Sequence, residues 1–283
     1  MYNWQKLSLE EKELSLNPKK AVIEHPKLQA IATSSAKKFR DAHPNKYLDI
    51  TYGKRVNQKL DIFLPKTINN NPVQLYFHGG YWIARDKFDH SHLAKPAINN
   101  NIIHVSVNYD LSPNVTLDII VEETYECLEW IIKNIRDYGG NPNNINLVGH
   151  SAGAHLVAMA LTRNYSINSF IKSAILISGI YQPQITQYLS ISKKIKLNKN
   201  IIKLTDVYNN NIVQKTNILI VVGNDEPNPW KRLSIDFSEW LKKNKTSFKF
   251  YNAIHLNHFT IVKALSEEKS ALSKKVTNMS VKI

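Results

Sequence analysis

Residues 149–153 read GHSAG, and this short stretch decides the predicted fold. It follows an apolar run at residues 145–148, which is typical of a buried strand, and precedes residues 152–163, which are typical of a helix. A catalytic serine between a strand and a helix stands on a sharp turn, so that its hydroxyl projects from the edge of the sheet. Such a turn tolerates only very small residues two positions before and after the serine. The pattern therefore predicts Ser151 as a nucleophile.

A second glycine-rich stretch, HGGYW at residues 78–82, follows the predicted strand Val73–Phe77. Acyl transfer needs backbone N–H groups aimed at the carbonyl oxygen as it becomes negative. An HGG-type motif after the third strand of such a sheet supplies one donor, because glycines let the backbone approach the substrate closely. The helix that begins at Ala152 supplies another from its N-terminus. We expect Gly79, Gly80 and Ala152 to form an oxyanion hole.

An activated serine needs a histidine as its base, and the histidine needs a carboxylate that orients it. The order along the chain is serine, then acid, then histidine. We expect His155, one helical turn beyond the serine, to pack rather than to act as the base. His255 and His258 lie just after the last predicted strand, where the base belongs, and Asp225 and Glu226 follow the strand before it. The residues alone leave both choices open.

Strand-like and helix-like segments alternate along most of the chain. After a helical segment at residues 1–45, residues 47–52 and 59–64 alternate apolar and polar side chains, as the strands of a half-buried hairpin do. Further strands are predicted at residues 73–77, 102–107, 145–148, 171–177, 218–222 and 248–251, and helices at 117–138, 152–163, 231–243 and the C-terminus.

This order predicts the α/β-hydrolase fold, in which helices cover both faces of a mostly parallel central sheet and an antiparallel hairpin precedes it. We expect residues 1–283 to form a single domain. Residues 178–216 read as irregular and are too long for a plain connection, so we expect them to form a small cap over the active site.

Composition and charge narrow the class of protein. The formal net charge is +14, from 37 Lys and Arg against 23 Asp and Glu, but the lysines are spread along the chain together with Ile and Asn. We therefore expect no nucleic-acid binding, since no motif of the known modules is present. The charged N-terminus and the lack of long apolar runs predict neither a signal peptide nor a membrane helix, and hence a cytoplasmic protein.

The sequence contains few of the features by which proteins bind cofactors. Cys127 is the single cysteine, so no internal disulfide can form, and its helical surroundings predict a buried, inert thiol. The sequence contains no HExxH, P-loop or GxGxxG motif. We expect no metal ion and no other cofactor.

Three motifs together, HGGYW (78–82), GHSAGAHL (149–156) and HFxxV (258–262), resemble those of the kynurenine formamidase, or arylformamidase, family and its bacterial relatives. The likeness runs along most of the chain. The other matching positions include the Asn-Pro element at Pro18, Asp86-Lys87, Leu117-Asp118 and Arg232. HGGYW together with GHSAGAHL is more specific than either motif alone, because other carboxylesterases usually continue HGG with glycine or another small residue.

The resemblance implies hydrolysis of N-formylkynurenine or a related aryl-formamide to formate and an aryl amine, a step of tryptophan catabolism. By position it assigns the nucleophile to Ser151, the base to His258, the acid to Glu226 and the oxyanion hole to Gly79, Gly80 and Ala152. Asp225 stays the alternative acid, because residues 227–230 read PNPW and depart from the family pattern. Tyr81 and Trp82, directly after the oxyanion glycines, are expected to contact the substrate.

Other functions compete with this interpretation. Within the same superfamily, the alternative is a short-chain carboxylesterase. From a different class comes a binding protein that keeps the fold and has lost catalysis, but such a protein has no need of a complete set of nucleophile, acid, base and HGG motif. We expect a small-molecule acyl amide or ester as the partner, no nucleic acid and no membrane, and leave a homodimer open.

Overall fold

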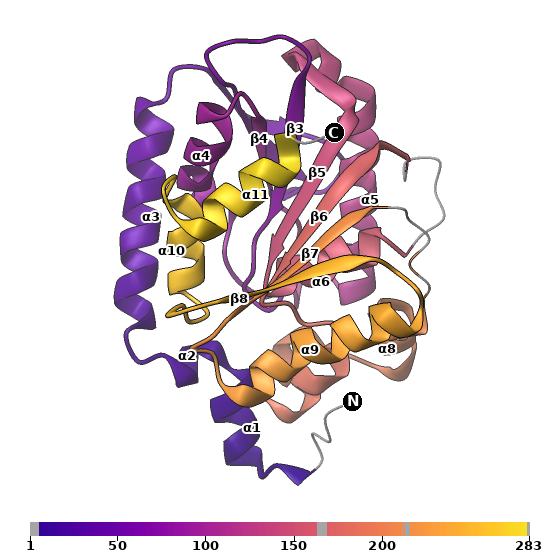
Figure 1. Cartoon of the computed structure of the whole chain (residues 1–283). Coiled ribbons are helices and arrows are strands. Elements are labelled where there is room, and N and C mark those ends of the chain that lie inside the picture. Colours follow the sequence, from indigo (N-terminus) through magenta and orange to yellow (C-terminus); the bar gives the residue numbers. More distant parts are fainter. Residues whose placement is uncertain (1–5, 163–168, 211, 213–215, 282–283) are drawn as a thin grey trace.

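A computed structural model describes residues 6–162, 169–210, 212 and 216–281 (Figure 1). Within these residues the centre of the molecule is a sheet of eight strands in the order β1-β2-β4-β3-β5-β6-β7-β8. The strands are β1 (Lys46–Thr51), β2 (Lys59–Phe63), β3 (Asn71–Phe77), β4 (Ile103–Val107), β5 (Gly140–His150), β6 (Ile171–Ile177), β7 (Asn217–Gly223) and β8 (Phe248–Ala253). β1 pairs antiparallel with β2 and β2 with β4, whereas all other neighbours are parallel. The predicted α/β-hydrolase fold is confirmed.

Helices connect these strands. They are α1 (Leu9–Leu16), α2 (Pro18–Ala21), α3 (His25–Ala42), α4 (Ala94–Asn99), α5 (Leu117–Asn134), α6 (Ala152–Ala160), α7 (Ser192–Ile195), α8 (Lys199–Thr205), α9 (Asn228–Lys243), α10 (Thr260–Ser266) and α11 (Ala271–Val281). The first two begin at side-chain caps: Ser8 forms a capping box with Glu11, and Asn17 accepts from the N–H of Lys19. The predicted end of α6 at residue 163 lies outside the described residues.

The two faces of the sheet are covered by different helices (Figure 1). The central strands β3, β5, β6 and β7 are apolar on both faces, and alternate side chains enter separate core clusters. Val73 and Leu75 pack on the face covered by α5, α6 and α9. Tyr76 packs on the opposite face, against α10 and α11. Because both faces are buried, the strands read as continuous apolar runs, as parallel strands do.

The segment at residues 178–216 is more ordered than its sequence indicates. It contains α7, α8 and two 3₁₀ helices, Pro183–Tyr188 and Val207–Asn209. The expectation of an irregular segment was wrong because each helix is too short for an apolar period to show. Asn198 caps α8 through its side chain. The role of this segment as a cap stays a prediction.

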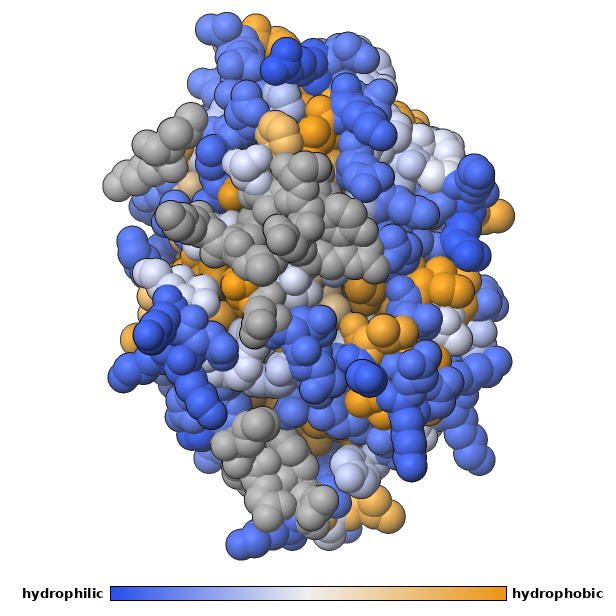
Figure 2. Space-filling view, turned by 90° about the vertical axis from the view of Figure 1, so that its right-hand side faces the viewer, coloured by the Kyte–Doolittle hydropathy of each residue, from blue (hydrophilic) through white to orange (hydrophobic). Residues whose placement is uncertain are grey.

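The surface is dominated by polar and charged side chains. Figure 2 shows mostly hydrophilic residues on the face it presents, with scattered hydrophobic areas between them. Within the described part of the chain, no helix combines the length and the apolar character that crossing a bilayer requires. Cys127 is a free thiol buried in α5, and burial raises its pKa far above the ordinary value.

Candidate active site

Ser151 stands on a sharp turn between β5 and α6, as the GHSAG motif predicts. Its backbone has φ 57° and ψ −118°, a conformation that non-glycine residues rarely adopt. The turn is held because the N–H of Ser151 donates to the carbonyl of Ile177 at the end of β6, 2.8 Å away. A Cβ atom on Gly149 would clash with the carbonyl of Gly153, and one on Gly153 with the carbonyl of Phe77. Both glycines are therefore required for the serine to stand where it does.

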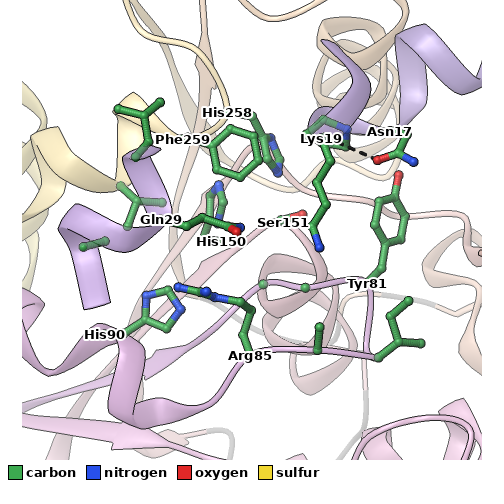
Figure 3. A pocket seen from close by; sticks show the side chains of 18 of the residues that line it. Asn17, Lys19, Gln29, Tyr81, Arg85, His90, His150, Ser151, His258 and Phe259 are labelled. Atoms are coloured by element: carbon green, nitrogen blue, oxygen red, sulfur yellow. Dashed lines mark hydrogen bonds between the residues drawn. The ribbon is translucent and has the colours of Figure 1, made fainter. Parts of the chain in front are cut away.

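Glu226 and His258 form a buried pair beside this serine. Nδ1 of His258 lies 2.6 Å from Oε1 of Glu226. The second carboxylate oxygen of Glu226 accepts from the hydroxyl of Ser178 at 2.9 Å and from the N–H of Gly223 at 2.8 Å. The carboxylate is thus fixed by two donors while it orients the imidazole. His258 and Ser151 line the same cavity, shown in Figure 3.

The other titratable candidates lie elsewhere. Asp225 and His255 are exposed, although each is within a few residues of the buried pair. His155 is buried and its Nε2 lies 2.7 Å from the carbonyl of Thr205, so it packs against its surroundings as expected. The structure therefore brings Glu226 and His258 together and keeps the two sequence neighbours apart from the site.

Burial shifts the pKa values of both His258 and Glu226 toward their neutral forms. It lowers the pKa of His258 well below the ordinary value for an imidazole. It also raises the pKa of Glu226, an effect that the donors from Gly223 and Ser178 oppose. The edge of Trp230 packs on His258 with ring centroids 4.6 Å apart, and this indole excludes water from the imidazole. A neutral imidazole at neutral pH is what general-base chemistry requires.

The HGGYW loop passes directly beside the nucleophile. A Cβ atom on Gly79 would lie 2.9 Å from Cβ of Ser151, so only glycine fits there without a shift. Gly80, Tyr81 and Trp82 follow with φ values of 118°, 55° and 58°. Three successive residues with positive φ turn the loop sharply back. Ala152 begins α6 on the other side of the serine, with the N–H groups of the first helical turn.

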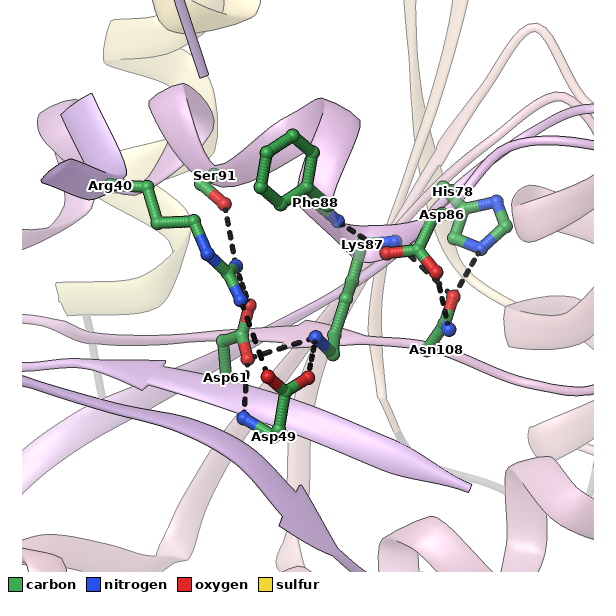
Figure 4. A network of polar contacts seen from close by, with 9 residues as sticks. All are labelled: Arg40, Asp49, Asp61, His78, Asp86, Lys87, Phe88, Ser91 and Asn108. Carbon is green, nitrogen blue, oxygen red and sulfur yellow. Dashed lines mark hydrogen bonds and ion pairs between the residues drawn. The ribbon is translucent and has the colours of Figure 1, made fainter. Parts of the chain in front are cut away.

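His78, the first residue of this loop, is held in place by hydrogen bonds and ring contacts with residues that follow β4 (Figure 4). Its Nε2 lies 3.2 Å from Oδ1 of Asn108, and its ring stacks on Tyr109 at a centroid distance of 4.4 Å. The hydroxyl of Tyr109 donates to the carbonyl of His78 at 2.6 Å. Asn108 in turn donates to Asp86 at 2.8 Å. His78 is a structural support for the glycines rather than a base, as its position in the motif indicates.

The same support extends to α3 through a partly buried ion network (Figure 4). Lys87 lies 2.6 Å from Asp49 and 3.0 Å from Asp61, and both distances are between Nζ and Oδ1. Arg40 of α3 pairs with Asp61, which is fully buried. Since Lys87 follows Asp86 directly, the network fixes the segment that leaves the HGGYW loop.

Two aromatic residues that the sequence assigns to substrate contact lie in different places. Tyr81 lines the cavity, and its hydroxyl donates to the carbonyl of Leu16. Trp82 is fully buried in the core, with the edge of its ring against His155, and is not among the described residues that line the cavity. Because its positive φ turns Trp82 away from the cavity, we retain only Tyr81 as a candidate substrate contact.

The N-terminal segment supplies one wall of the cavity. The lining residues from this segment are Asn17, Pro18, Lys19, Leu28, Gln29 and Ala32. From residues 178–216, by contrast, Ile191 is the one described lining residue. The sequence indicates a helical N-terminus but gives no sign that this segment lines the cavity. Packing between segments far apart in the chain leaves no local signal in the residues.

Other side chains at the site were missed for related reasons. Ser178 donates a hydrogen bond to Glu226 but belongs to no motif. Trp230 contacts His258, but the pattern of its own helix does not reveal this long-range contact. A polar residue directly after a parallel strand is a signal that could have found Ser178, because strand ends meet at the site. Within the described residues, no group of three or more His, Cys, Asp or Glu side chains is placed to hold a metal ion.

A known protein family matches the part of the chain that forms most of the sheet. A family model described as alpha/beta hydrolase fold fits residues 74–230. This range begins in β3 and extends into α9, so it contains the HGGYW loop, Ser151 and Glu226.

Curated relatives match most of the chain. The kynurenine formamidase of Danio rerio is 26% identical over 294 residues, covering 99% of this chain and 99% of that protein. The kynurenine formamidase of Salmo salar is 28% identical over 229 residues, covering 77% of this chain and 76% of its own. The resemblance predicted from the three motifs is confirmed.

Solved structures share the same architecture. The crystal structure of a protein from Silicibacter sp. superimposes with a TM-score of 0.83 at 24% identity, covering 94% of this chain and 99% of that one. The hyperthermophilic esterase of the archaeon Pyrobaculum calidifontis does so with a TM-score of 0.74 at 16% identity, covering 96% and 95%. At these identities the likeness is one of fold.

Proposed function

Because this chain belongs to the alpha/beta hydrolase fold family, we propose that it is a serine hydrolase that removes the formyl group of N-formylkynurenine or a related aryl-formamide. The observation that carries the proposal is the buried Glu226–His258 pair, in which His258 lines the same cavity as the strained Ser151. The curated relatives named kynurenine formamidase support the choice of substrate.

In the first half of the reaction, Oγ of Ser151 attacks the formyl carbon while His258 takes the hydroxyl proton. The carbonyl oxygen becomes negative, and the N–H groups of Gly79, Gly80 and Ala152 stabilise it. The intermediate collapses, the carbon–nitrogen bond breaks, and His258 returns the proton to the departing aryl amine. Glu226 stabilises the imidazolium that exists between these two proton transfers.

In the second half, water attacks the formyl ester on Ser151, and His258 takes one of its protons. The ester bond breaks, formate leaves, and the proton returns to the oxygen of Ser151. Amide hydrolysis needs the leaving nitrogen to be protonated, and an aryl amine departs more easily than an alkyl amine. Tyr81 and Phe259 line the cavity and offer rings on which an aryl group stacks.

Replacing Glu226 by glutamine is expected to lower kcat by about 10³–10⁴, as loss of the orienting carboxylate does in a serine triad. Glutamine keeps the shape of the side chain but loses the charge that stabilises the imidazolium. The matched control is Asp225→Asn, one residue away and exposed, which is expected to change kcat by less than about twofold. Steady-state rates and thermal unfolding of both variants check this. Equal and small losses would place the acid elsewhere.

A substrate series tests the choice of acyl group. We expect N-formylkynurenine to be hydrolysed and p-nitrophenyl acetate to exceed the butyrate ester by roughly tenfold or more in kcat/KM, because each methylene that a small pocket rejects is worth about 1–3 kcal/mol. The octanoate ester completes the series. If kcat/KM rises with acyl length and N-formylkynurenine is untouched, the formamidase proposal is wrong and the carboxylesterase alternative stands.

A further inference from the structure

Positively charged side chains line the cavity in front of Ser151. Its lining includes the cations Arg85 and Lys19, and no aspartate or glutamate among the residues that the structure describes. The two side chains approach from different elements, Arg85 from the loop after the oxyanion glycines and Lys19 from α2. Figure 3 shows Arg85 on the side of His90 and Lys19 on the side of Tyr81, with Ser151 between them.

The Arg85 side chain is held through its Nε atom, which leaves its two Nη atoms available to bind a ligand. Its Nε atom lies 3.3 Å from Oδ2 of Asp89, and both side chains are less than one-fifth exposed. Within the described part of the chain, no hydrogen bond or ion pair engages its terminal Nη atoms. The φ of Arg85 is 81°, a conformation that is costly for a long side chain and persists only where the surroundings enforce it. The fork of an arginine matches a carboxylate through two parallel hydrogen bonds.

His90 adds a polar group that has no partner of its own. It lies in the 3₁₀ helix Lys87–Leu93, is 6% exposed, and lines the same cavity. Neither of its ring nitrogens has a hydrogen-bond partner among the described residues. Burial, then the neighbouring His78 and Arg85, lower the pKa of His90 well below the ordinary value, so the ring is neutral and has one N–H to donate. A buried donor without a partner is costly unless a ligand completes it.

The volume of the cavity limits the size of an anionic ligand that could bind beside these cations. Its volume is about 140 Å³, close to the roughly 150 Å³ of an engineered apolar cavity that binds benzene. Tyr81 and Phe259 supply aromatic surface within it. The space suits one aromatic ring with short substituents, and a net charge of +14 favours the approach of anions.

We propose that Arg85 and His90, with Lys19 as a second cation at the mouth, form a subsite for a carboxylate carried by the aromatic leaving group of the substrate. The proposal rests on the proposed hydrolase function and narrows its substrates to aryl amides and esters whose leaving group carries a carboxylate. The carboxylate engages the Nη atoms of Arg85, whose Nε faces Asp89, and accepts from His90. Neutral substrates of equal size leave both groups unsatisfied.

The test is a pair of substrates that differ in charge alone. We compare kcat/KM for 4-acetoxybenzoate and 4-acetoxybenzamide, and for N-formylkynurenine and its carboxamide. The intact enzyme is expected to prefer each carboxylate by about tenfold or more, mainly through KM, because a hydrogen bond to a charged group is among the strong ones. Arg85→Gln is expected to reduce this ratio to about one, whereas Arg85→Lys retains part of it because the charge remains.

A neighbouring lysine supplies the matched control for the second cation. Lys20 also belongs to α2 and is exposed, but it is not among the described lining residues. Lys19→Gln is expected to lower the carboxylate preference about two- to fivefold, while Lys20→Gln leaves it at the value of the intact enzyme, since exposed charges act weakly over distance.

The outcomes separate the inference from the proposed function. If the enzyme hydrolyses both members of each pair at equal kcat/KM, and Arg85→Gln leaves the ratio unchanged, the carboxylate subsite is wrong while the hydrolase stands. If no substrate is hydrolysed, the proposed function fails, and binding of 4-formamidobenzoate against 4-formamidobenzamide by calorimetry decides the subsite. Tighter binding of the carboxylate by about tenfold that Arg85→Gln abolishes supports it, and equal binding overturns it.

Discussion

Replacing Ser151 by alanine is expected to lower kcat by on the order of 10⁵–10⁶, the largest loss that any single substitution in this chain produces. The reason is that alanine has no atom to form the acyl-enzyme, so what remains is the modest contribution of the oxyanion donors and of binding. The turn itself is held by the Ser151 N–H and by Gly149 and Gly153, all of which the alanine variant keeps. The melting temperature should therefore change by only a few degrees.

The control is Ser35→Ala, the same change at an exposed position of α3. It should leave kcat within about twofold of the intact enzyme. Rates of p-nitrophenyl acetate hydrolysis for the three proteins give the comparison, with circular dichroism to show that each is folded. A loss of only two- or threefold in Ser151→Ala would remove the serine from the chemistry.

The second large effect concerns the base. His258→Ala is expected to lower kcat by about 10⁴ or more, because the serine then keeps its proton and the leaving amine receives none. His255→Ala, three residues earlier and exposed, should cost less than about tenfold. The two variants differ in burial and in contact with Glu226, so their ranking tests the pairing seen in the structure. The reverse ranking would move the base to His255.

Much of the sheet could be predicted because its strands are short apolar runs between turn residues. β3, β6 and β7 are buried on both faces along most of their length, so most of their positions are apolar, with Gln74 and Ser173 among the buried polar exceptions. β1 and β2 form the antiparallel hairpin and alternate apolar and polar side chains instead. β1 is the largely exposed edge strand, whereas β2 lies between β1 and β4, and its polar Asp61 is fully buried and pairs with Arg40. The sequence order of strand and helix then leaves few topologies to choose from.

The pairing of Glu226 with His258 could be narrowed from the sequence but not decided by it. Asp225 and Glu226 follow the same strand, and their side chains point in different directions because the turn after Gly223 folds back on itself. The N–H of Glu226 bonds to the carbonyl of Gly223, which directs the Glu226 carboxylate inward. Such a turn depends on contacts with Leu256 and Ala253, which lie about thirty positions later in the chain.

The cavity wall and the placement of Trp82 could not be predicted. Local patterns show that α1 to α3 are helices, but not that they pack across the carboxyl edge of the sheet toward Ser151. Trp82 follows the oxyanion glycines in sequence, and adjacency suggested contact with the substrate. Three successive positive φ values reverse that inference, because they turn the ring into the core. Backbone conformation of this kind has no signature in residue type outside glycine.

The central claim is that Ser151 is an activated nucleophile, and covalent labelling by a fluorophosphonate probe tests it most directly. The probe phosphonylates a serine whose hydroxyl is made nucleophilic by a neighbouring base. We expect one adduct per chain by intact mass, mapped to the peptide that contains Ser151, with no adduct in Ser151→Ala and greatly slowed labelling in His258→Ala. An intact chain that stays unlabelled, or that carries the adduct at another serine, would contradict it.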